Sequence, residues 1–140
     1  MKEYELIIFI IVGFYVSVYD IKYKIIPDYI ILPSIAILLI FKFLNSSLAI
    51  THLYSILFII TIFVLPIVLG FRFGGGDIRF GIFSSILLGF PNIAWFILLS
   101  ASLHLLILLI LKKKEYPFAP SMFLATIVVY FTNEILWSFI

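Results

Sequence analysis

The sequence predicts an all-α, polytopic membrane protein with six transmembrane helices. Hydrophobic residues make up 65% of the 140 residues and charged residues only 11%, whereas soluble domains contain roughly 45–50% apolar residues. The mean hydropathy is +1.32. The apolar residues form six runs of about the length that a bilayer requires, and no stretch is polar enough for a separate soluble module. We therefore expect residues 1–140 to form a single transmembrane domain.

Short polar breaks separate the six apolar runs. These breaks contain prolines, glycines, asparagines or lysines, which are typical of turns: Lys22 and Lys24 with Pro27, then "LNSS", the glycine run, "PN" and "KKKEYP". The predicted spans are residues 4–19, 29–44, 51–70, 78–90, 92–111 and 118–139.

The fourth run is the shortest of the six. A helix of about 14 residues, from Asp77 to Phe90, rises only about 20 Å, against a hydrocarbon core of about 30 Å. Either the bilayer thins around this helix, or the glycines before it already lie below the membrane surface. Irregular backbone at that depth is tolerated only inside protein or beside a wet cavity. The second alternative therefore implies protein or a cavity around Asp77.

The basic residues predict the orientation in the membrane. Seven of them fall in or beside the first, third and fifth connections: Lys22, Lys24, Arg72, Arg79, Lys112, Lys113 and Lys114. Only Lys2 and Lys42 fall on the other side. Because cytoplasmic loops carry the excess of positive charge, we expect a multi-pass protein of the cytoplasmic (inner) membrane with both termini outside. The three lysines of the fifth connection suit contact with the anionic headgroups of the lipid bilayer.

Four acidic residues fall at the predicted cytoplasmic ends of spans: Asp20, Asp28, Asp77 and Glu115. Asp28 follows Pro27 and precedes an apolar run, which predicts a helix N-cap. Glu115 follows a lysine cluster in a loop, where we expect it to be solvated. Asp20 and Asp77 need another explanation, because an unpaired carboxylate at this depth is costly.

Position alone leaves two interpretations of Asp20 and Asp77 open. The topology places both at the same depth on the same side, so the two carboxyl groups can meet. Alternatively each pairs with a nearby base, Asp20 with Lys24 at helical spacing and Asp77 with Arg72 or Arg79. The sequence positions by themselves favour neither interpretation.

Three consecutive glycines, Gly74, Gly75 and Gly76, directly precede Asp77. They remove every side chain from this backbone and permit conformations that other residues avoid. A flexible hinge also uses glycines, but a hinge does not require an acid fixed to its end. We therefore expect a ligand to approach this backbone closely, which favours a joint site over separate ion pairs.

Three motifs follow one another in a defined order along the chain. "YDIKYKIIPDYIILP" contains Asp20 seven residues before Pro27; Gly74–Asp77 forms a GxGD element with the basic Arg79 two places later; and "PFAP" occupies residues 117–120. Together they resemble the motifs of the type IV prepilin peptidases and archaeal preflagellin peptidases, which are membrane aspartyl proteases. The resemblance covers most of the chain.

The resemblance implies that Asp20 and Asp77 are the catalytic pair of a transmembrane peptidase domain. It implies that the residues binding substrate or supporting the site are Gly74, Gly75, Gly76, Arg79 and Pro27. The implied substrates are pilin-like or archaellin-like precursors, which would lose a short basic leader peptide at the cytoplasmic face, next to their hydrophobic helix. We expect no cofactor, no metal and no nucleic-acid partner. Larger members carry paired cysteines in a segment linked to methylation; this chain has no cysteine, so we expect no methyltransferase activity.

Two adjacent carboxyl groups can hydrolyse a peptide bond. One is ionised and activates water, while the other is protonated and donates its proton. Because like charges in contact resist joint ionisation, the pair shares one proton. Asp77 would begin a helix, which favours a carboxylate, and Asp20 would end one, which disfavours it. We therefore expect Asp77 to be the base and Asp20 the acid, with Arg79 strengthening this bias if it points toward Asp77.

Two other functions remain open. A small transporter or channel subunit could bind or relay cations through the two carboxylates, although these acids lie at one face and not at the midplane. A catalytically inactive scaffold for pilus assembly is the other.

His104 lies in the middle of the fifth span, where we expect an interhelical hydrogen bond. Its depth argues against a catalytic role.

Overall fold

The computed structural model describes residues 2–70 and 74–138. This part of the chain contains six α-helices: α1 (Lys2–Tyr23), α2 (Asp28–Leu44), α3 (Ile50–Val68), α4 (Gly75–Leu88), α5 (Asn92–Leu111) and α6 (Ala119–Ser138). The prediction of an all-helical chain is confirmed. No helix end differs from the predicted span by more than four residues, because prolines, glycines and charged residues interrupt the apolar runs where the helices end.

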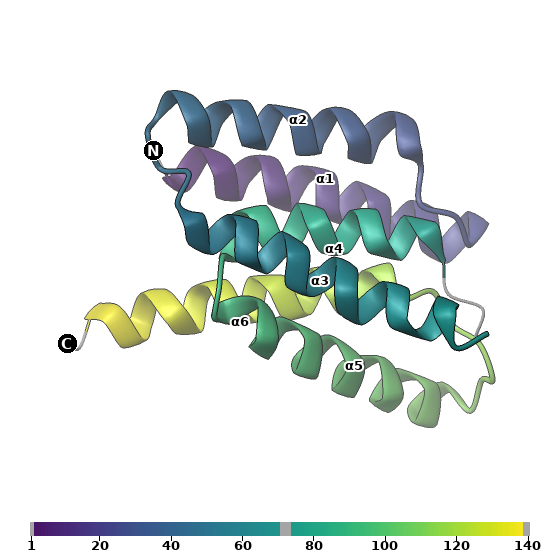
Figure 1. The fold of residues 1–140 in the computed structure, drawn as a ribbon. Helices are drawn as coiled ribbons and strands as arrows, with labels where there is room; N and C mark the ends of the chain where they lie inside the picture. Colours follow the sequence, from purple (N-terminus) through teal and green to yellow (C-terminus); the bar gives the residue numbers. More distant parts are fainter. Residues whose placement is uncertain (1, 71–73, 139–140) are drawn as a thin grey trace.

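Consecutive helices run in alternating directions along the bundle (Figure 1). The ends of α1, α3 and α5 therefore meet the starts of the helices that follow them at one end, which we call the loop end. The N- and C-termini both lie toward the opposite, terminal end (Figure 1). This is the arrangement that six consecutive spans imply. The side of the membrane that each end faces stays a prediction.

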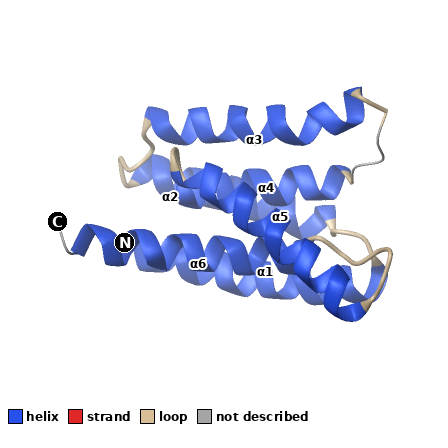
Figure 2. Cartoon of the chain, turned by 90° about the horizontal axis from the view of Figure 1, so that it is seen from below, coloured by secondary structure: helices blue, strands red, loops and turns tan. Residues whose placement is uncertain are grey.

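The short helix α4 lies at the centre of the bundle, where it contacts all five other helices (Figures 1 and 2). Eight of its 14 residues are buried, whereas α5 buries three of 20. Polar side chains join it to its neighbours: Ser55 Oγ donates to the Ser85 carbonyl at 3.0 Å, and Thr126 Oγ1 donates to Ser84 Oγ at 3.0 Å. A helix surrounded by protein does not need to match the hydrocarbon thickness by itself.

Three of the described helices are long and apolar enough to cross a membrane, judged by length and composition. They are α1, α3 and α5. The helices α2 and α4 are shorter, with 17 and 14 residues, and α6 contributes an apolar described segment at Ala119–Asn133. Three of the six predicted spans thus meet the criterion, and the crossing of the other three stays a prediction.

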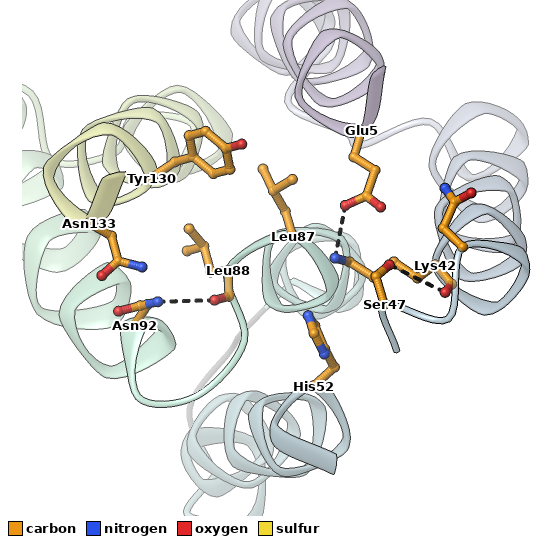
Figure 3. A pocket seen from close by; sticks show the side chains of 10 residues that line it. Glu5, Lys42, Ser47, His52, Leu87, Leu88, Asn92, Tyr130 and Asn133 are labelled. Atoms are coloured by element: carbon orange, nitrogen blue, oxygen red, sulfur yellow. Dashed lines mark hydrogen bonds and ion pairs between the residues drawn. The ribbon is translucent and has the colours of Figure 1, made fainter. Parts of the chain in front are cut away.

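A polar cavity of about 330 Å³ lies at the terminal end, beside the end of α4 (Figure 3). In its wall, Lys42 Nζ of α2 lies 2.8 Å from Glu5 Oε2 of α1, and both side chains are buried. A buried charge is tolerated when it is paired, so this pair joins α1 to α2. Lys42 is one of the two basic residues predicted on the outer side, and Glu5 neutralises it.

Candidate active site

Asp20 lies in the last turn of α1 and is 5% exposed. The helix ends just after it, because Lys24 has a left-handed conformation (φ 55°) and its N–H donates to the Asp20 carbonyl at 2.8 Å. The Asp20 carboxyl group accepts a hydrogen bond at Oδ2 from the backbone N–H of Ala119, at 3.2 Å. Ala119 is the first residue of α6. The first and the last helix therefore meet at this carboxyl group.

Asp77 lies in the first turn of α4 and is half-buried. The helix begins after Gly74, whose φ of −72° and ψ of 126° are those of extended backbone. A Cβ atom on Gly74 would lie 2.8 Å from Asp77 Oδ2. The absence of a side chain at Gly74 therefore leaves the space that the Asp77 carboxyl group occupies.

Gly76 provides the contact between α4 and the α1–α2 connection. A Cβ atom on Gly76 would lie only 2.8 Å from the Cβ atom of Ile26, which is buried in that connection. The next residue, Pro27, is the N-cap of α2, and its carbonyl accepts the N–H groups of Ile30 and Ile31 at 3.2 and 3.1 Å. This packing brings the residues that follow Asp20 against the turn that carries Asp77.

The three glycines act through the space they leave, and not through unusual backbone conformation. Positive φ angles occur in the described glycines at Gly70 and Gly89, but not at Gly74, Gly75 or Gly76. The expectation of conformations closed to other residues is therefore wrong. Gly75 differs from its neighbours, because a Cβ atom there would have no heavy atom within 4 Å. It is exposed and lines a cavity.

Asp20 and Asp77 line the same cavity at the loop end, with a volume of about 670 Å³. Its wall also includes one face of α5 and part of the α5–α6 connection. A second cavity of about 340 Å³ is lined by both aspartates and by Gly74, Gly75, Gly76 and Arg79. The structure thus brings together every residue predicted for the site except Pro27. Pro27 is the N-cap of α2 and does not line either cavity.

Arg79 pairs with Asp28, since its Nη1 donates to Asp28 Oδ1 across the α2–α4 contact. Asp28 is the first residue of α2, and Pro27 occupies the N-cap position without a side-chain cap. The prediction of Asp28 as an N-cap is therefore wrong. The alternative pairing of Arg79 with Asp77 is also wrong, because the guanidinium group is held by Asp28. The other predicted partner, Arg72, lies outside the described residues.

The alternative ion pair between Asp20 and Lys24 does not form in the described structure. The carboxyl group of Asp20 accepts the Ala119 N–H instead, and the Lys24 backbone turns away from the helix through its positive φ angle. Both residues nevertheless line the two cavities. Lys24 therefore contributes positive charge to the site without a direct ion pair to Asp20.

His104 lies in the wall of the larger cavity. Its Nδ1 lies 3.5 Å from Ser121 Oγ of α6, and its ring meets the edge of Phe118 at a centroid distance of 4.9 Å. The predicted interhelical hydrogen bond is confirmed, but the expectation that depth keeps His104 away from the site is wrong. The buried residues of α5 all fall between positions 93 and 100, and the residues of α5 that line the cavity follow them, from Ala101 to Leu108. The signal was present in the sequence, because an ionisable side chain within a span is itself typical of a functional site.

A model of the type IV leader peptidase family matches residues 7–110, well over half of the chain. The chain belongs to this family. No curated protein and no solved structure gave a match. The matched residues of this protease family include Asp20, Pro27 and the Gly74–Asp77 element, and they end before "PFAP". The structure places that last motif at the site as well, because Ala119 within it donates to Asp20.

In this member of the leader peptidase family, the carboxyl group of each aspartate has a helix N-terminus beside it. Asp77 is in the first turn of α4, and Asp20 accepts the first N–H of α6. Helix N-termini favour negative charge. The argument that made Asp77 the base and Asp20 the acid is therefore weaker, since the N-terminus of α6 opposes the effect of the C-terminal turn of α1 at Asp20, and the assignment stays a prediction. Among the described residues, no group of three or more His, Cys, Asp and Glu side chains could hold a metal ion.

Proposed function

We propose that this chain is an aspartyl endopeptidase that removes the basic leader peptide from pilin-like or archaellin-like precursors, with Asp20 and Asp77 as its catalytic pair. The observation that carries this proposal is that the two aspartates, far apart in the sequence, line one cavity. Membership of the type IV leader peptidase family supports it. A transporter would place such acids along a path through the bundle, and these lie at one end of it.

The two carboxyl groups would divide the work of hydrolysis. The ionised group takes a proton from a water molecule, whose oxygen attacks the carbonyl carbon of the scissile bond, and the protonated group gives its proton to the leaving nitrogen. The bond between carbon and nitrogen then breaks, which leaves a carboxylic acid and an amine. A water molecule needs about 30 Å³, so the cavity of about 670 Å³ has room for water and a segment of peptide. The exposed backbone at Gly75 is where an extended substrate can approach.

We also propose that all six helices cross the membrane as one peptidase domain, with the loop end in the cytoplasm. The distribution of charge supports this orientation. Lys24 lines the cavities at the loop end, and Lys112, Lys113 and Lys114 follow α5 there. The described basic side chain at the terminal end, Lys42, is neutralised by Glu5.

Purified protein incubated with a pilin-type precursor tests the proposal. We expect two products, and mass spectrometry of the larger one should place its new N-terminus directly after the basic leader. The same preparation in liposomes tests the alternative function. A precursor that stays intact while the protein conducts cations would contradict the peptidase proposal and support the transporter or channel.

Replacing His104 by leucine is expected to lower kcat/KM for precursor cleavage about fivefold, which corresponds to one ordinary hydrogen bond. The reason is that His104 lines the cavity of the two aspartates. Ser121→Ala is the matched control, because it removes the same interhelical hydrogen bond without removing the imidazole from the cavity. An equal loss in both variants would show that His104 acts only through helix packing.

A further inference from the structure

We propose that Glu115 binds the basic leader peptide and thereby sets the direction in which the precursor enters the larger cavity. This inference rests on the proposed peptidase function. It assigns a specificity-determining role to a residue that sequence position alone predicts to be merely solvated.

Glu115 lines the larger cavity together with Asp20 and Asp77. It lies in the α5–α6 connection, four positions beyond the last residue of α5, and its side chain is exposed. The three lysines before it in the sequence, Lys112 to Lys114, are not among the residues lining this cavity. The connection therefore contributes Glu115, and not its three lysines, to the wall beside the two aspartates.

The part of the same wall that α5 forms is apolar apart from His104. Ala101, Leu105 and Leu108 line the cavity along one face of α5, and Leu105 is 58% exposed. Because a helix rises about 1.5 Å per residue, Ala101 lies about 15 Å deeper along α5 than its last residue, Leu111. The wall thus carries Glu115 at its outer edge and mainly apolar residues of α5, with His104 among them, deeper inside. A chain with basic residues before the scissile bond and an apolar helix after it fits this wall in one direction only.

Glu115 determines the sign of the net charge in the larger cavity, because the other charges in its lining offset one another. If the two aspartates share one proton, they carry one negative charge, and Lys24 in the same lining offsets it. His104 is the remaining titratable group from α5 in this wall. In the second cavity, Arg79 is paired with Asp28. Glu115 therefore supplies the net negative charge that a basic peptide requires.

The test compares Glu115→Gln with wild type on two precursors, one with its natural basic leader and one whose leader lysines and arginines are replaced by glutamine. For the basic leader we expect a KM about two- to fivefold higher with kcat unchanged, the size of a partly exposed charge pair. For the neutral leader we expect no difference between the two proteins. A loss of the same size on both precursors would overturn the proposal.

Lys113→Gln is the matched control in the same connection. If the precursor responds only to the net charge of this loop, Lys113→Gln should lower KM by as much as Glu115→Gln raises it. If instead the contact between the leader and Glu115 determines KM, Lys113→Gln should leave KM unchanged. A lower KM for Lys113→Gln would therefore contradict the proposal.

Charge reversal separates this inference from the proposed function. Glu115→Lys adds positive charge to a loop that is already basic, so the predicted orientation is retained. We expect this variant to cleave a precursor with an acidic leader better than wild type does. If Glu115→Lys cleaves the acidic-leader precursor no better than wild type does, while wild type still cleaves the natural precursor, only the role of Glu115 is overturned. Failure of wild type to cleave any precursor would instead contradict the peptidase function.

Discussion

Replacing either Asp20 or Asp77 by asparagine is expected to lower the rate of precursor cleavage by at least about 10²- to 10⁴-fold, the contribution of general acid–base groups. Asparagine keeps the size of the side chain but can neither take up nor release the proton. At position 20, the amide oxygen of asparagine can still accept the hydrogen bond that the Ala119 N–H donates to Asp20 at 3.2 Å. Both variants should therefore fold, with helical content by circular dichroism like that of wild type.

Two further variants sharpen this test of the pair. Residues that act as one unit are strongly non-additive, so the double variant should be no slower than the more damaged single variant. Asp28→Asn is the matched control, because Asp28 lines the second cavity but is paired with Arg79. That pair is partly exposed and is worth about 1 kcal/mol or less, so cleavage should change little. Substantial cleavage by Asp20→Asn or Asp77→Asn would exclude the proposed mechanism.

The helices were largely predictable because their signals are local. Apolar runs interrupted by proline, glycine and lysine indicate where a helix ends whatever lies beside it, and α5 has the bounds that the sequence predicts, residues 92–111. The shortness of the fourth helix was also predicted. Its central position was not, because a short run does not show which neighbours surround it. The contacts of α4 with all five other helices supply the reason why the length is tolerated.

The side-chain partners at the site were less predictable, because they come from distant parts of the chain. Arg79 and Asp28 are 51 positions apart, and a rule of helical spacing finds only partners three or four positions away. Asp20 and Ala119 are 99 positions apart. His104 was misplaced for a related reason. Depth along a helix does not show whether that part of the helix packs on the core or borders a cavity.

Replacing Gly76 by alanine is expected to destabilise the protein by about 1–3 kcal/mol, the usual cost of forcing an extra methyl group into a packed site. The new Cβ atom would lie 2.8 Å from the Cβ atom of Ile26. That atom is the branch point of a buried side chain and cannot move away without its backbone. Either the start of α4 or the α1–α2 connection must shift. Thermal unfolding in detergent measures the loss of stability.

The same substitution should lower precursor cleavage about 100-fold, because a displacement of about 1 Å in reacting groups has an effect of this size. The clash lies between the segment after Asp20 and the residue directly before Asp77, so any shift that relieves it changes the separation of the two carboxyl groups. An unfolding temperature and a cleavage rate both like those of wild type would show that this contact does not position the pair.

Gly75→Ala is the control that separates packing from substrate approach. A Cβ atom on Gly75 would have no heavy atom within 4 Å, and alanine is favoured over glycine in a helix by up to about 1 kcal/mol. We therefore expect unchanged or slightly higher stability. If an extended substrate pairs with this exposed backbone, the added methyl group should raise KM while leaving kcat near its wild-type value. A loss of stability in both alanine variants would instead mean that this turn tolerates no side chain at all, so that neither glycine reports on the substrate.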